Sequence, residues 1–210
     1  MSLTTHFNEI IKNEIHNSIE TFTKVLDDHN LLTLIEEIAA FCTNQINLGH
    51  KLIFAGNGGS AADSQHLAAE LVSKLNYDRP GLAAIAITTD TSALTAIGND
   101  YGYQYSFSRQ IEALGNRGDV FFAISTSGNS ANILNAIESA KNRGITVIGL
   151  TGEPGGKMAT LCDYVIQIPS KLTPKIQEGH IMLGHIICAL IEEAIFGMEY
   201  NPKTAMACAL

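Results

Sequence analysis

Cysteine is scarce in this 210-residue sequence, and the four cysteines are far apart. They stand at positions 42, 162, 188 and 208 with no C-x-x-C spacing, which excludes a zinc ribbon and a disulfide scaffold. Basic residues are also few, because 13 Lys and Arg stand against 21 Asp and Glu for a formal charge of −8. Non-specific nucleic-acid binding needs clustered positive charge, so we predict no nucleic-acid partner.

The sequence also predicts neither a leader peptide nor a membrane-spanning segment. Residues 1–9 are polar, with no basic stretch followed by an apolar one. The most apolar run near the C-terminus, 186–191, is ended by Glu192 and Glu193. We therefore expect a cytoplasmic protein with reduced thiols and no membrane partner.

Hydrophobic residues make up 46% of the chain, which is enough for the core of one globular domain. Apolar residues at helical spacing predict an N-terminal pair of helices within residues 7–48, at about 7–26 and 31–48. Uninterrupted apolar runs, typical of buried parallel strands, follow at 51–55, 83–87, 120–124, 145–150 and 164–168. Helical segments are predicted at 61–74, 91–97, 105–114, 131–142 and near 157, with a long closing helix at about 174–196.

This order predicts an α/β fold: a three-layer α/β/α sandwich around a parallel sheet of about five strands. We see no linker or internal duplication, so residues 1–210 are expected to form a single domain. Ligands of such folds bind at the carboxyl ends of the strands, which directs attention to the loops that follow them.

Two of those loops have the composition of a phosphate cradle. Loop 56–60, GNGGS, allows backbone N–H groups to approach a ligand at a helix N-terminus. Loop 125–130, STSGNS, brings four hydroxyls to the start of a helix that Ser130 is placed to cap. The first loop is neither a G-x-G-x-x-G fingerprint nor a Walker A loop. Plain turn and cap chemistry would use the same residue types, so that alternative stays open.

The helix after the first loop carries His66 and Glu70, which share one face because they are four residues apart. An imidazole and a carboxylate at this spacing can bind one metal ion, although a solvated ion pair has the same spacing. The closing helix adds Gln177, His180 and His185, and spacing does not choose between the two histidines.

With these motifs the sequence resembles the phosphoheptose isomerases of the SIS (sugar isomerase) domain superfamily, from the N-terminal helices to the closing helix. The glycine and hydroxyl loops identify only the superfamily. The set His66, Glu70, Gln177 and His185 is more specific and indicates the catalytic heptose branch. The motifs that carry the resemblance are 56–60, His66, Glu70, Gly98-Asn99-Asp100, 125–130, Lys175-Ile176-Gln177-Glu178 and His185.

The resemblance implies an aldose-ketose isomerase that converts sedoheptulose 7-phosphate to D-glycero-D-manno-heptose 7-phosphate through an enediol, the first step toward an ADP-heptose precursor. It implies Glu70 as the catalytic base and His185 as the acid. One zinc ion per subunit is implied, with ligands His66, Glu70, Gln177 and His185, and a purely structural role for zinc stays open. The implied substrate contacts are Asn57, Gly58, Gly59, Glu70, Asn99, Asp100, Ser125, Thr126, Ser127, Ser130 and Gln177.

Two positions depart from the family pattern. Some members have an acidic residue where this chain has Pro174, so a ring-opening role assigned to that acid does not transfer. Lys74 stands where an Arg is usual, which keeps the charge but loses the planar fork of a guanidinium.

Other functions are weighed against the same residues. A non-catalytic SIS adaptor, of the type that binds the replication initiator DnaA, shares the loops but lacks the acid and the second histidine of the metal set. An SIS transcriptional regulator would need an added helix-turn-helix domain. An isomerase of another sugar phosphate stays open, although arabinose phosphate types usually carry extra regulatory domains.

The resemblance also implies a homotetramer, and the spacing on the closing helix predicts a site at a subunit interface. Gln177 and His185 are 185 − 177 = 8 residues apart, which is about 12 Å along a helix. They can share one ion if the helix breaks, at Gly179 or Gly184, or if a neighbouring subunit donates one ligand. The apolar stretch 181–196 suits burial against a partner, and packing on its own sheet is the alternative.

Overall fold

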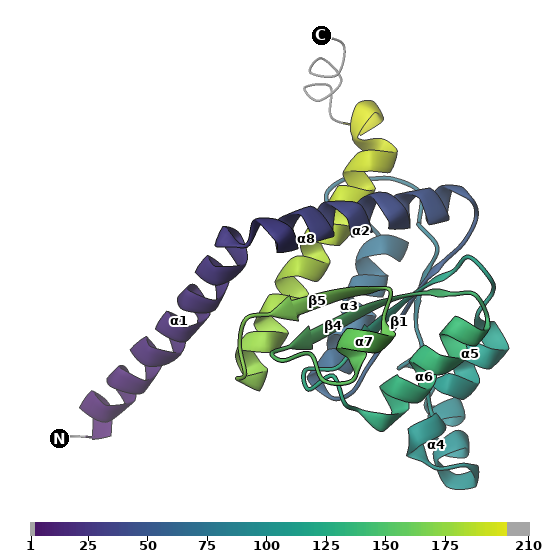
Figure 1. Cartoon of the computed structure of the whole chain (residues 1–210). Helices are drawn as coiled ribbons and strands as arrows, with labels where there is room; N and C mark the ends of the chain where they lie inside the picture. Colours follow the sequence, from purple (N-terminus) through teal and green to yellow (C-terminus); the bar gives the residue numbers. More distant parts are fainter. Residues whose placement is uncertain (1–2, 201–210) are drawn as a thin grey trace.

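The computed structural model describes residues 3–200, and its elements follow the predicted order of strands and helices (Figure 1). In chain order they are α1 (Leu3–Asp27), α2 (His29–Asn47), β1 (Leu52–Gly56), α3 (Gly59–Val72), β2 (Ala84–Ala86), α4 (Thr91–Asp100), the 3-10 helix η1 (Tyr103–Tyr105), α5 (Ser108–Leu114), β3 (Val120–Ile124), α6 (Ala131–Asn142), β4 (Thr146–Gly152), α7 (Met158–Leu161), β5 (Tyr164–Ile168) and α8 (Thr173–Tyr200). The strands form one sheet in the order β2-β1-β3-β4-β5, and every pair is parallel. The predicted α/β class, the five-stranded parallel sheet and the N-terminal helical pair are confirmed.

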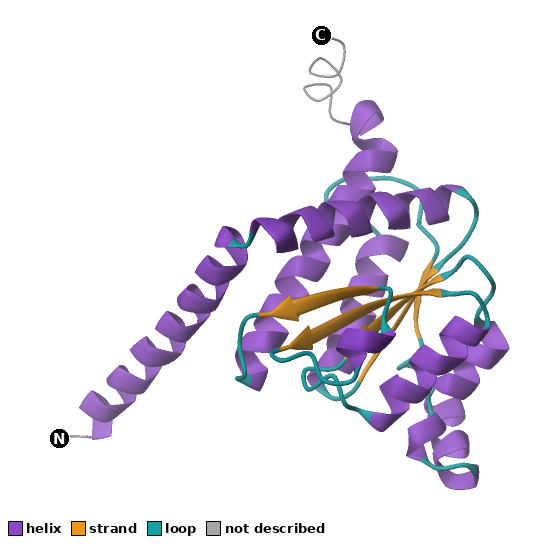
Figure 2. Ribbon diagram, in the orientation of Figure 1, coloured by secondary structure: helices purple, strands orange, loops and turns teal. Residues whose placement is uncertain are grey.

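Helices cover both faces of the sheet, which makes three layers (Figure 2). Adjacent residues of one strand point to opposite faces, so Phe121 and Phe122 belong to different core clusters. The cluster of Phe122 includes residues of α2, α3 and α8, such as Leu183, whereas the cluster of Phe121 includes residues of α5 and α6, such as Ile137. Burial on both faces explains why the strands read as unbroken apolar runs.

Several predicted element boundaries differ from the structure by a few residues. The helix expected over 105–114 is two elements, η1 and α5, because Ser106 and Phe107 between them are buried and anchor the chain to the core. The strand expected over 83–87 is three residues long, since β2 is an edge strand that pairs with β1 alone. The closing helix runs to Tyr200.

Gly179 and Gly184 do not break α8, which is one continuous helix. A Cβ at Gly179 would come within 2.7 Å of Ile168, and a Cβ at Gly184 would come within 2.7 Å of Leu67. The two glycines therefore permit close packing of α8 on β5 and α3. The expectation of a possible break at these positions is wrong, and the first of the two explanations for the spacing of Gln177 and His185 is removed.

By length and composition alone, one helix among residues 3–200 could cross a membrane, namely α8 over Thr173–Gly197. In the fold this helix packs on α2 and α3, and its Leu183, Ile187 and Ile191 are buried in the core. Core packing is thus sufficient to explain its apolar sequence.

Candidate active site

The two polar loops meet at the carboxyl edge of the sheet. Strands β1 and β3 are neighbours, with Gly56 opposite Ile124, so loops 56–60 and 125–130 leave the sheet side by side. Between them lies a cavity of about 280 Å³. Its lining is Asn57, Gly58, Gly59, Ser60, Ile124, Ser125, Thr126, Ser130, Thr173 and Gln177.

Glycines shape the first loop because the backbone of Ser60 and the side chain of Gln177 approach it closely. A Cβ at Gly56 would stand 2.5 Å from the carbonyl oxygen of Ser60, so the turn from β1 into α3 has no room for a side chain there. At Gly59 a Cβ would stand 2.5 Å from Nε2 of Gln177. The loop thus brings the N-terminus of α3 and the Gln177 amide of α8 to the same cavity.

In the second loop the hydroxyls face one another. Ser125 Oγ lies 2.9 Å from Ser130 Oγ and 3.5 Å from Ser127 Oγ. Ser130 occupies the N-cap position of α6, but its side chain makes no capping hydrogen bond, so the predicted cap is wrong. Its hydroxyl is engaged by Ser125 instead. Hydroxyl hydrogens rotate freely, which leaves this pair able to donate to an anion in the cavity.

A cluster of possible metal ligands lies further along α3, where His66 and Glu70 meet His185 of α8. Their ligand atoms all lie within 4.8 Å of one another. His66 Nε2 is 2.7 Å from His185 Nε2 and 3.2 Å from Glu70 Oε1. The His66 side chain is 50% exposed, so the cluster opens to the surface of the chain.

The fold decides between the two histidines of α8. His180 is fully buried, and its Nε2 lies 3.1 Å from the carbonyl oxygen of Thr151. Burial lowers the pKa of His180 to about 4, against a smaller opposing effect of that hydrogen bond, so its ring is neutral at physiological pH. His185 is the histidine that reaches His66 and Glu70.

The chemistry of this donor set fits zinc. Two imidazole nitrogens and one carboxylate are common zinc ligands, and these three leave room for a fourth ligand. Asp63 adds a feature that sequence reasoning missed: its Oδ2 is buried and has no hydrogen-bond partner among the described residues. Burial raises the pKa of Asp63, while the charges of His66 and His185 act to lower it. Its position three residues before His66, on the same face of α3, was the available signal.

Some of the expected site residues lie outside the cavity of this chain. Asn99 and Asp100 end α4, are exposed, and bond to each other at 2.7 Å. Ser127 is exposed, and its Oγ accepts from the backbone N–H of Asn129. Gln177 lines the cavity, and on unbroken α8 its Cα is about 12 Å along the axis from that of His185.

Two residues that the sequence did not single out hold Asn57 at the cavity mouth. Asn132 donates to Asn57 Oδ1 at 2.8 Å and accepts from its Nδ2 at 2.9 Å. The Tyr103 hydroxyl donates to the same Oδ1 at 3.1 Å. Periodicity could not reveal these contacts, because residues 57, 103 and 132 come from three separate elements.

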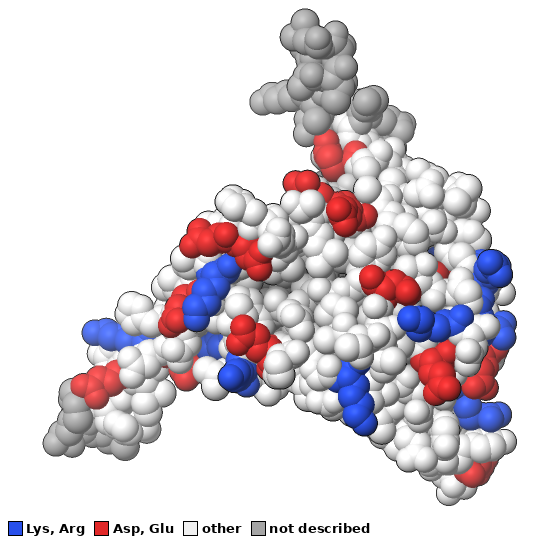
Figure 3. Space-filling model, in the orientation of Figure 1, with Lys and Arg blue, Asp and Glu red and all other residues white. Residues whose placement is uncertain are grey.

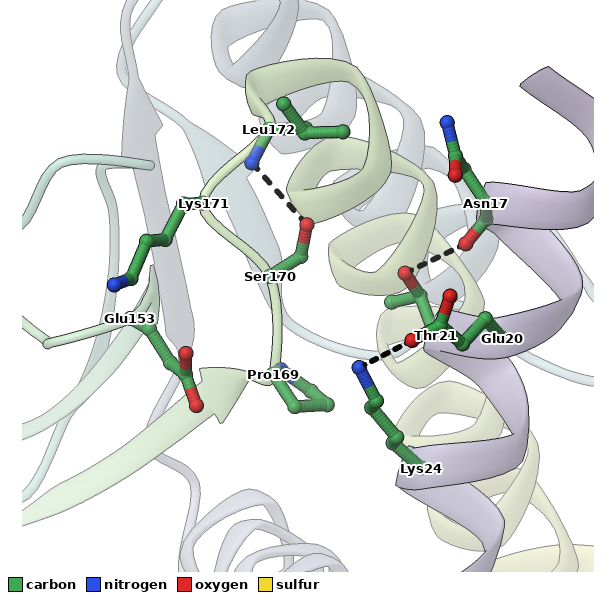
Figure 4. Close-up of a pocket in the computed structure, with 9 residues that line it drawn as sticks. All are labelled: Asn17, Glu20, Thr21, Lys24, Glu153, Pro169, Ser170, Lys171 and Leu172. Atoms are coloured by element: carbon green, nitrogen blue, oxygen red, sulfur yellow. Dashed lines mark hydrogen bonds and ion pairs between the residues drawn. The ribbon is translucent and has the colours of Figure 1, made fainter. Parts of the chain in front are cut away.

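A second cavity, of about 270 Å³, separates α1 from the segment between β5 and α8 (Figure 4). Charges of both signs line it, with Lys24 paired to Glu20 at 2.7 Å and Lys171 and Glu153 on the opposite wall. It lacks the hydroxyl loops of the first cavity.

On the face shown in Figure 3, basic and acidic side chains are interspersed. This face shows no large positive patch that would attract an anion. Binding of an anionic substrate therefore needs hydrogen-bond donors at the site, such as the N–H and hydroxyl groups of loops 56–60 and 125–130.

Comparison with known proteins decides the family. A model of the SIS domain matches residues 14–152. The phosphoheptose isomerase of Aneurinibacillus thermoaerophilus is 59% identical over 193 residues, which cover 92% of this chain and 98% of that protein. The chain therefore belongs to the phosphoheptose isomerase family of SIS-domain proteins.

Other phosphoheptose isomerases agree with this placement. Phosphoheptose isomerase 2 of Campylobacter jejuni is 54% identical over 198 residues, covering 94% of this chain and 98% of that protein. The solved phosphoheptose isomerase of Neisseria gonorrhoeae superposes with a TM-score of 0.84 at 42% identity, covering 89% of this chain and 99% of that one. The expected resemblance is confirmed over nearly the whole chain, and with it the enzyme class.

Proposed function

We propose that this chain isomerises sedoheptulose 7-phosphate to D-glycero-D-manno-heptose 7-phosphate in the cytoplasm. The observation that carries the proposal is the meeting of His66, Glu70 and His185 within 4.8 Å of one another. The cluster lies between α3 and α8, and its His66 stands about 9 Å, or nearly two turns, beyond the end of the loop 56–60 that opens the hydroxyl-lined cavity. Acid–base groups and a phosphate cradle are the two parts that this reaction needs.

The reaction moves a carbonyl from C2 to C1 of the sugar chain. The Glu70 carboxylate takes a proton from C1, and His185 donates a proton to the oxygen on C2, which forms the enediol. His185 then accepts the proton of the C1 hydroxyl, and Glu70 returns its proton to C2. Substrate and product are isomers, so both groups end in their starting protonation states.

Zinc fits the donor atoms of His66, Glu70 and His185, and one ion per subunit is proposed here. Its contribution when bound is positive charge that stabilises the enediolate. The chain's own residues orient the sugar: Asn57 is held by Asn132 and Tyr103 at the cavity, and the serine hydroxyls bind the phosphate.

The direct test is an assay of the purified protein with sedoheptulose 7-phosphate, before and after treatment with a chelator. We expect turnover that the chelator abolishes and zinc restores. Absence of turnover by folded, zinc-supplemented protein would refute the proposed function. Turnover that survives complete metal removal would refute the zinc requirement alone.

A further prediction concerns the phosphate cradle. Ser125→Ala and Ser130→Ala are expected to raise KM more than they lower kcat, because hydroxyl contacts to a remote phosphate bind substrate and transition state alike. Steady-state kinetics measure both constants. Ser139→Ala, on α6 but outside the cavity, is the matched control and should leave KM unchanged. An unchanged KM in both cradle variants would place the phosphate elsewhere.

We also propose that the working form is a homotetramer with its sites at subunit interfaces. Phe7, Ile11, Ile15 and Ile19 recur every four residues on α1 and are 52%, 58%, 56% and 55% exposed. Helix α1 leaves the body of the chain, so this apolar face is not covered by the sheet (Figure 1). An exposed apolar stripe of this length favours contact with another copy.

The spacing of Gln177 and His185 gives this assembly a testable consequence. Because α8 is unbroken, we expect Gln177 to complete the metal site of a neighbouring subunit. Inactive Glu70→Gln and Gln177→Ala proteins should then recover activity when they are mixed, partly denatured and refolded together. In such hybrids one site takes Glu70 from one chain and Gln177 from the other.

The control mixture combines Glu70→Gln with His185→Ala. These two residues meet within one chain, so hybrids of this pair should stay inactive. Equal failure of both mixtures would mean that each chain supplies its whole site. Full activity of a dilute monomer would refute the shared site.

A further inference from the structure

A buried ion pair links the C-terminal end of α3 to α8, the two helices that carry the candidate catalytic cluster. Arg79 follows α3 in the chain and Glu192 belongs to α8, and their side chains are both 0% exposed. Arg79 Nε donates to Glu192 Oε1 at 2.9 Å. A buried ion pair seldom stabilises a fold more than well-packed apolar residues would, so its position calls for a separate explanation.

The guanidinium of Arg79 caps the C-terminal end of α3. Its Nη2 donates to the carbonyl oxygen of Glu70 at 2.9 Å, and its Nη1 donates to that of Leu71 at 2.6 Å and that of Ser73 at 3.1 Å. The last carbonyls of a helix have no partners within it. One planar side chain therefore holds the turn of α3 that includes Glu70.

The carboxylate of Glu192 holds the same segment from the side of α8. It accepts from the backbone N–H of Leu75 at 3.0 Å and of Asn76 at 2.7 Å, in addition to Arg79. Burial alone would raise the pKa of Glu192, but these donors outweigh it and lower that pKa. The carboxylate is therefore ionised at physiological pH. Together, Arg79 and Glu192 form a clamp between α3 and α8.

The geometry connects this clamp to the site. Arg79 bonds to the backbone of Glu70 itself. Glu192 follows His185 by seven residues, which is about two turns, and so lies on nearly the same face of α8. A contact at this place resists sliding and rotation of α3 against α8, and these movements would change the separation of Glu70 and His185.

We propose that Arg79 and Glu192 are positioning residues that hold Glu70 and His185 at the separation needed for metal binding and proton transfer. The inference rests on the proposed function of that cluster. Both side chains are fully buried and so out of reach of a substrate, which means that their loss should act through the geometry of the cluster.

The test compares Glu192→Gln and Arg79→Lys with a matched control, Asp119→Asn. Asp119 is also buried, accepts from the backbone N–H groups of Lys51 and Asn116, and pairs with Lys51. It precedes β3 and so lies at the opposite end of the sheet from the site. Thermal unfolding, zinc affinity by competition with a chromophoric chelator, and kcat and KM are measured well below the Tm of each variant.

All three variants are expected to have a lower Tm. Glu192→Gln and Arg79→Lys should also weaken zinc binding about 10-fold and lower kcat with little change in KM, as loss of a supporting contact does at other metal sites. Asp119→Asn should keep wild-type zinc affinity and kcat. If Glu192→Gln does not fold, Arg79→Lys decides by the same criteria.

Wild-type zinc affinity and kcat in a folded clamp variant would overturn the inference and leave a purely structural ion pair. An equal loss in Asp119→Asn would overturn it as well, since general destabilisation would then explain the effect. A wild-type protein that binds zinc but does not isomerise the sugar refutes the proposed function, and zinc affinity still tests the clamp. A wild-type protein that binds no zinc overturns the inference.

Discussion

Glu70→Gln and His185→Ala are each expected to lower kcat by at least about 100-fold, because positioned acid–base groups contribute about 10²- to 10⁴-fold. Glutamine keeps the size of Glu70 but accepts no proton from carbon. Alanine at position 185 removes both the proton donor and a nitrogen of the cluster. Initial rates with sedoheptulose 7-phosphate measure the effect.

Neither substitution should unfold the protein. Glu70 and His185 lie outside both hydrophobic core clusters and are partly exposed. Circular dichroism and thermal unfolding check that each variant keeps the wild-type structure. Glu138→Gln, at an exposed position of α6, is the control for loss of a carboxylate and should keep full activity. A folded variant at position 70 or 185 that keeps more than about a tenth of wild-type kcat contradicts a direct role.

Gly128→Ala is expected to have the largest effect on stability. Gly128 has φ +64°, where an L-residue costs about 1 to 2 kcal/mol. A Cβ there would also overlap the carbonyl oxygen of Gly155, a backbone atom that cannot rotate away. Overpacking of this kind adds about 1 to 3 kcal/mol. Urea denaturation should therefore show a loss of about 2 to 5 kcal/mol in the free energy of unfolding.

Gly49→Ala separates the two causes. Gly49 has φ +87°, and a Cβ added there would meet no atom within 4 Å, so only the backbone cost applies. We expect about 1 to 2 kcal/mol for this control. Equal losses at positions 49 and 128 would show that the chain around Gly155 relaxes at no cost. Where Gly128→Ala still folds, a raised KM is expected, because position 128 lies within loop 125–130, whose hydroxyls are proposed to bind the phosphate.

Local patterns in the sequence were sufficient for the fold class. Uninterrupted apolar runs between helical stretches predict buried parallel strands, because both faces of the sheet must be covered. The strand–loop–helix order then places loops 56–60 and 125–130 at the same edge of the sheet. The pairing of His66 with Glu70 was also accessible, since four residues make about one helical turn.

Contacts between elements were accessible only from the tertiary structure. Helical spacing could not choose between His180 and His185, because the choice depends on how α8 is rotated against β4 and α3. The Ser130 hydroxyl was expected to cap α6, but the neighbouring Ser125 engages it in the folded loop.

The sequence by itself determined the family, the fold and the residue types of the site, because those depend on order and spacing along one chain. The tertiary structure decided which side chains meet. Asp63 beside the histidines, Gln177 against Gly59, and the clamp of Arg79 with Glu192 all depend on the packing of α3 against α8. Packing of that kind is set by side chains that lie far apart in the sequence. The spacing of apolar residues within one helix or strand therefore cannot predict it.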